Sequence, residues 1–129
     1  MVKAYPRSTS GSSNPAIPFF EQPVEGELEM DGTEQILFEK TDDKVSLVEG
    51  MINLSSLKTG DRVIIREYMQ TLSSGEYALY TEETFDGPHP VPLIQIATKI
   101  SMHDIKITIQ QTTGTNRTLE FSFTRRRVE

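Results

Sequence analysis

Apolar and polar residues alternate along most of the chain with a period of two, the pattern of β-strands that bury one face. The alternation is clearest in residues 105–110, where isoleucine takes every second position, and in residues 119–123, where Leu119, Phe121 and Phe123 do so. No stretch repeats apolar residues at the spacing of three and four that an amphipathic helix needs. The pattern therefore predicts an all-β fold.

Turn residues divide this pattern into about eight strands, expected near residues 27–30, 36–38, 45–54, 61–71, 77–85, 93–99, 105–110 and 119–123. Such regularly spaced turns favour a jelly-roll-like β-sandwich of antiparallel strands. Asp31-Gly32 predicts a type I′ hairpin, because both central residues of that turn need positive φ. Leu54 and Leu57, followed by Gly60, predict a crossing between sheets in which the leucines close the core.

The first 20 residues differ in composition from the rest, with four serines, three prolines and one glycine. Such a segment buries too little apolar surface to offset its ordering entropy, which predicts an extended N-terminal arm before a sandwich domain of residues 21–129. Phe19 and Phe20 are expected to anchor the arm on a neighbouring subunit or to pack on the chain's own sandwich. The arm residues predicted to take part in assembly are Tyr5, Ile17, Phe19 and Phe20.

The formal net charge of −6 is concentrated in one block of the sequence. Residues 21–50 carry ten acidic and two basic residues, whereas residues 51–129 carry nine of each. An acidic chain lacks the basic face that neutralises phosphates, so nucleic acid is not an expected partner. The basic tail is expected to pair with acidic residues of the same chain or of a neighbour, and so to join an assembly interface through Arg125, Arg126 and Arg127.

Residue types that carry enzyme chemistry are sparse or badly spaced. The chain has no cysteine, which excludes disulfides, thiol nucleophiles and zinc sites built from cysteine. Adjacent Glu82 and Glu83 point to opposite faces of a strand and cannot flank one substrate. Phosphate-binding glycine loops and serine-nucleophile motifs do not occur in the sequence. We therefore predict no enzymatic activity and no cofactor. No apolar run approaches the roughly 20 residues of a membrane-spanning helix, so no membrane partner is expected either.

The two histidines lie in separate turns. His89 follows Pro88, and His103 precedes Asp104. These turns could hold a metal only if the fold brought them together, because a metal site needs three or four ligands. The prolines make the first turn stiff, so we expect no metal but a projecting contact loop with Asp86, Pro88, His89 and Pro90.

Three stretches carry a family resemblance, namely residues 31–38, residues 54–68 and residues 105–114. In this order they resemble small all-β structural proteins of the virions of archaeal and bacterial viruses and proviruses. The resemblance covers residues 31–123 and brings no catalytic residues. It implies a non-enzymatic structural subunit in the virion, such as a capsid decoration, cement or turret protein or a tail component. Its expected partners are protein subunits of the same particle.

Two other classes of protein fit the same pattern. A carbohydrate- or ligand-binding β-sandwich would use Tyr77, Tyr80 and the loop of residues 86–92. A strand-exchanging extracellular filament subunit would complete each sandwich with one strand from the previous subunit.

Overall fold

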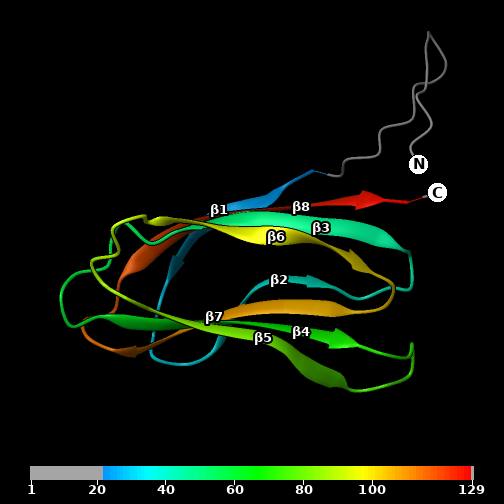
Figure 1. The fold of residues 1–129 in the computed structure, drawn as a ribbon, viewed down its shortest axis with the longest axis horizontal. Coiled ribbons are helices and arrows are strands. Elements are labelled where there is room, and N and C mark those ends of the chain that lie inside the picture. Colours follow the sequence, from blue (N-terminus) through cyan, green and yellow to red (C-terminus); the bar gives the residue numbers. More distant parts are fainter. Residues whose placement is uncertain (1–21, 129) are drawn as a thin grey trace, which may run out of the picture.

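The computed structural model describes residues 22–128, which form eight β-strands (Figure 1). The strands are β1 (Val24–Glu29), β2 (Gln35–Lys40), β3 (Ser46–Asn53), β4 (Arg62–Gln70), β5 (Tyr77–Asp86), β6 (Leu93–Ser101), β7 (Ile105–Thr113) and β8 (Thr118–Arg127). Within the described part of the chain there is no helix, and so none that could span a membrane.

The strands form two antiparallel sheets that face each other. Sheet A has the order β1-β8-β3-β6, and sheet B has the order β2-β7-β4-β5. Strand pairs β1·β8, β2·β7, β3·β6 and β4·β5 are all hydrogen-bonded, so the chain is one long hairpin wrapped into a sandwich. This wrapping is the jelly roll, and the predicted fold class is confirmed.

The hydrophobic core lies between the two sheets. Ile105, Ile107 and Ile109 on β7 are all completely buried, which confirms the inward face that the alternation predicted. The ring of Phe123 on β8 stacks on Phe38 of β2, with centroids 5.5 Å apart. A Cβ atom on Gly50 would lie 2.2 Å from Cδ1 of Phe123, so only glycine leaves room for this ring.

The predicted hairpin at Asp31-Gly32 is wrong. The turn leads from β1 in sheet A to β2 in sheet B, and these strands do not pair with each other. Gly32 has the expected positive φ of 88°. However, Oδ1 of Asp31 accepts bonds from N and Oγ1 of Thr33, at 2.9 and 2.6 Å. These side-chain bonds stabilise the turn without any pairing of the flanking strands, which find their partners in β8 and β7.

The predicted crossing between sheets is confirmed. The chain leaves β3 in sheet A and enters β4 in sheet B, and Leu54 and Leu57 are both buried on the way. The Leu57 amide donates to the Leu54 carbonyl at 3.1 Å, which forms a short turn. Gly60 ends the crossing with a φ of 94°, a conformation that disfavours side chains.

The predicted arm of residues 1–20 lies outside the described residues, together with Tyr5, Ile17, Phe19 and Phe20. The division into an arm and a sandwich domain therefore stays a prediction. All eight strands lie within residues 24–127.

Candidate assembly interface

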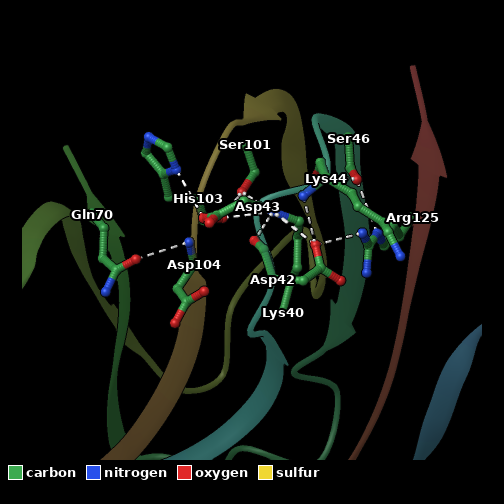
Figure 2. A network of polar contacts seen from close by, with 10 residues as sticks. All are labelled: Lys40, Asp42, Asp43, Lys44, Ser46, Gln70, Ser101, His103, Asp104 and Arg125. Atoms are coloured by element: carbon green, nitrogen blue, oxygen red, sulfur yellow. Dashed lines mark hydrogen bonds and ion pairs between the residues drawn. The ribbon is translucent and has the colours of Figure 1, made fainter. Parts of the chain in front are cut away.

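One end of the sandwich is closed by the buried ammonium group of Lys40 (Figure 2). Its side chain is completely buried, and Nζ donates to the carbonyl oxygens of Asp42 and His103 at 2.8 and 2.6 Å. Ser101 supplies a third acceptor at 3.4 Å. Burial lowers the pKa of Lys40. This lysine ties the β2–β3 and β6–β7 connections together, so its role is structural.

Arg125, predicted as an interface residue, is part of the same network. Its Nη2 lies 2.8 Å from Oδ1 of Asp42, and its Nε donates to Oγ of Ser46 at 2.9 Å. Burial opposes ionisation of Asp42, but the Arg125 bond, the Lys44 amide and nearby positive charge together lower its pKa to about 2. The acidic block thus meets the basic tail within the chain at this position.

The other two tail arginines lie elsewhere on β8. Arg126 is opposite Leu47 and borders a small depression on the outer face of sheet A. Arg127 is exposed at the end of the strand, opposite Ser46. Their predicted part in assembly stays a prediction.

The opposite end of the sandwich is closed by the carboxylate of Asp61, whose side chain is 1% exposed. Oδ2 accepts bonds from the Lys58 amide at 2.7 Å and from Nε of Arg117 at 2.6 Å. Oδ1 accepts a bond from the Thr115 amide at 3.1 Å. The Arg117 bond is the main reason why the pKa of Asp61 is lowered. Asp61 therefore joins the β3–β4 and β7–β8 connections, as Lys40 joins two connections at the other end.

The predicted projecting loop connects β5 to β6 and is anchored at its base. Asp86 pairs with Nε of Arg62 at 2.7 Å, with both side chains more than half exposed. Nδ1 of His89 lies 2.7 Å from the Val91 carbonyl oxygen, so this imidazole makes a contact inside the loop. Pro88 and Pro90 are exposed. The loop thus exposes two prolines to solvent, and Asp86 and His89 have separate partners.

The structure does not bring the two histidines together. The turns of His89 and His103 lie at opposite ends of β6, and nine strand residues span about 30 Å. His103 instead pairs with Oδ1 of Asp43 at 3.0 Å. Among the described residues, no three His, Asp or Glu side chains are placed to hold a metal ion.

The residues proposed for a ligand site are also separated. Tyr77 begins β5, whereas the loop of residues 86–92 follows its end, about 30 Å away along ten strand residues. Tyr77 packs against Tyr68 on the outer face of sheet B, with ring centroids 6.3 Å apart. Nζ of Lys106 lies 4.8 Å from both ring centroids and covers this pair. The described fold thus assembles no site from the predicted set.

Exposed apolar side chains gather along one side of the sandwich. β5 and β6 are the edge strands of their sheets, and Lys99 of β6 reaches Glu67 of β4 across the gap between sheets, at 2.9 Å. These two edges therefore lie on the same side. Seven of the twelve exposed large apolar residues in the described chain lie on β5, on β6 or in the turns next to them, and we call them together the β5–β6 side: Leu72, Leu79, Tyr80, Val91, Leu93, Ile100 and Met102.

The outer face of sheet A combines an apolar half with an acidic half. Met51 on β3 and Leu93 and Ile100 on β6 are between 45% and 61% exposed. Beside them, Glu27 on β1 lies directly opposite Glu120 on β8. Two shallow, open grooves of about 420 and 490 Å³ share the Met51 and Ser122 positions on this face. Their lining also includes Gln22, Pro23, Glu25, Glu27, Glu49, Asn53, Leu93, Gln95 and Glu120.

Sequence reasoning missed this face, although a signal for it is present. Leu47-Val48 and Met51-Ile52 each place two large apolar residues side by side in one strand. Neighbouring strand residues point to opposite faces, so each pair supplies one residue to the core and one to the outer face. Val48 and Ile52 are buried, and Met51 is exposed. Apolar residues on both faces of a strand indicate an outer face that contacts something other than water.

Comparison with protein-family models, with curated proteins and with solved structures found no match to this chain. The described residues form an eight-stranded jelly roll with exposed apolar residues on and beside its edge strands β5 and β6.

Proposed function

We propose that this protein is a non-enzymatic structural subunit of a virion, of the capsid decoration, cement, turret or tail type, which assembles with protein subunits of the same particle. The observation that carries the proposal is the run of exposed apolar side chains along the β5–β6 side. Exposed apolar side chains that are concentrated in one part of a protein mark protein contacts, and an unprotected sheet edge offers backbone groups for pairing.

Two further features support a structural role. Jelly rolls form many viral capsid proteins, although they also form lectins and cupins, so the fold supports the virion by analogy alone. In addition, the buried charges of Lys40 and Asp61 are used to join connections at the two ends of the sandwich. Both charged groups thus serve to hold the fold together.

The proposal is tested by measuring the mass of the full-length chain in solution over a range of concentrations, by sedimentation velocity. We expect a concentration-dependent oligomer that Leu79→Lys or Ile100→Lys dissociates, because each places a charge on the β5–β6 side. Ile36→Lys is the matched control, since Ile36 is 52% exposed like Leu79 but lies on β2 at the opposite edge. A chain that stays monomeric, alone and with the other proteins of its particle, would refute the proposal. So would an equal effect of the control.

Strand exchange is a second form that assembly can take, and β1 favours it. Five of its six residues are exposed, and its pairing is confined to one neighbour, β8. A strand that contributes so little to the core can be supplied by another copy at small cost. If β1 is exchanged, a chain carrying Glu27→Cys and Glu120→Cys, which lie directly opposite each other on β1 and β8, will form its disulfide between two chains, whereas an unexchanged copy will form it within one chain.

A further inference from the structure

We infer that the outer face of sheet A binds the N-terminal segment, residues 1–20, of a neighbouring copy. The inference rests on the proposed function, since it names the contact through which copies join. It extends the β5–β6 side onto the outer face of sheet A, with Leu93 common to both, and three observations lead to it.

The first observation is the shape and apolar content of the face. The two grooves of about 420 and 490 Å³ meet at Met51 and Ser122 and together cross all four strands of the sheet. Met51, where the two grooves meet, is 45% exposed, and Leu93, which lines the first groove on β6, is 53% exposed. The segment of residues 1–20 ends in Ile17-Pro18-Phe19-Phe20, an apolar run of a length that an open groove of this size can hold.

The second observation is charge. Glu25, Glu27 and Glu120 line the first groove, and the directly opposed pair of Glu27 and Glu120 is destabilising in the isolated chain. A positively charged ligand removes this repulsion. Residues 1–20 contain Lys3 and Arg7 and no acidic residue, so the segment has the complementary charge.

The third observation is where the described chain begins. Gln22 and Pro23 line the second groove, so residues 1–20 are joined to the sandwich at the rim of this face. Pro23 biases Gln22 toward extended backbone, which opposes a tight reversal onto the chain's own groove. Extended backbone at Gln22 therefore favours contact of the segment with a neighbouring copy.

The absence of cysteine from the chain allows a direct test by disulfide cross-linking. A full-length Phe19→Cys chain of natural isotopes is mixed with a ¹⁵N-labelled full-length Met51→Cys chain, and the mixture is oxidised mildly. We expect mass spectrometry to find the disulfide between a light and a heavy chain. The matched control is Ile36→Cys, which is 52% exposed on β2 of sheet B, opposite Thr108 and at the edge away from β5. Its cross-link yield should be at least fivefold lower.

A second measurement examines the role of charge. Glu27→Gln with Glu120→Gln should lower the cross-link yield severalfold at low salt. In about 1 M salt the difference should vanish, because the screening length falls to about 3 Å. Glu76→Gln with Glu83→Gln removes the same charge from exposed positions outside sheet A and should leave the yield unchanged.

The outcomes separate the inference from the proposed function. If Phe19→Cys and Met51→Cys in one chain give a disulfide within that chain only, while the protein still forms oligomers, the neighbouring-copy inference is wrong and assembly stands. Equal cross-linking at Met51→Cys and Ile36→Cys overturns the inference in the same way. A monomer at every concentration overturns both.

Discussion

Asp61 and Asp86 each accept a bond from the Nε atom of an arginine at nearly the same distance, 2.6 and 2.7 Å, but in opposite surroundings. The Asp61 side chain is 1% exposed, whereas that of Asp86 is 63% exposed. Comparing the two aspartates therefore tests how burial changes the contribution of an Asp–Arg bond to stability, because the bond length is almost the same in both. Asp61→Asn should destabilise the fold strongly, and Asp86→Asn should leave it nearly unchanged.

The magnitude follows from the three bonds that Asp61 accepts. In Asp61→Asn, the amide oxygen can still accept from Lys58 and Arg117, but the new NH₂ group then faces the Thr115 amide. An unmatched buried donor costs about 1–3 kcal/mol, and bonds to a charged acceptor are stronger than those to a neutral one. We expect the free energy of unfolding to fall by about 3 kcal/mol. Asp86→Asn loses an exposed ion pair, which water and salt already screen.

Urea denaturation at pH 7, followed by far-ultraviolet circular dichroism, measures both variants. The Arg117 bond lowers the folded-state pKa of Asp61. Its contribution is therefore complete above the unfolded pKa of about 3.9 and is lost as the pH falls through the lower folded value. At pH 3 and below, the difference in the free energy of unfolding between Asp61→Asn and the unsubstituted chain should become smaller. A loss under about 1 kcal/mol at pH 7, or an equal loss in Asp86→Asn, would refute the reasoning.

Three further predictions concern other contacts in the sandwich. The pKa of Asp42 is about 2 in the folded chain, so its ionised carboxylate stabilises the fold above about pH 4. The unsubstituted chain should lose this stability as the pH falls from about 4 to about 2, whereas Asp42→Asn should lack it at every pH. Acid titration followed by fluorescence or circular dichroism checks this. Lys99→Met should cost about 3–5 kcal/mol in urea denaturation, because it leaves Glu67 buried and unpaired, and adding Glu67→Leu should restore most of the loss. Gly50→Ala should cost about 1–3 kcal/mol, and Phe123→Leu in the same chain should relieve part of that cost; additivity of the two would contradict the predicted clash.

The sequence supported the fold class because its strands are long and strictly alternating. Residues 105–110 show this best, since their isoleucines form the centre of the core as expected. Pairing was harder to infer, as the Asp31-Gly32 turn illustrates. Local turn chemistry is the same whether the next strand pairs with the previous one or crosses to the other sheet. The choice depends on distant strands, here β8 and β7, which a local pattern does not contain.

The candidate interface was less accessible to sequence reasoning than the fold. Arg125 was predicted to pair with acidic residues of the same chain or of a neighbour, and the structure shows that pairing within the chain, because the Arg125 side chain is 12% exposed and bonded to Asp42. Alternation along β8 alone places Arg125 on the inner face and Arg126 on the outer face. The outer residues of β3 and β6 could have been found from their adjacent apolar pairs, but the groove that they form requires the sheet order.

The wrapped hairpin has a consequence for how the protein is made. β1 pairs with β8 from Val24 opposite Phe123 onwards, so the first strand has no partner until nearly the whole chain has left the ribosome. Strands so far apart in the sequence pair slowly, because the entropy of closing a long loop is lost before any stabilising contact forms. During synthesis sheet A therefore stays incomplete until its last strand, β8, has emerged. Only a completed chain therefore presents the four-stranded outer face of sheet A.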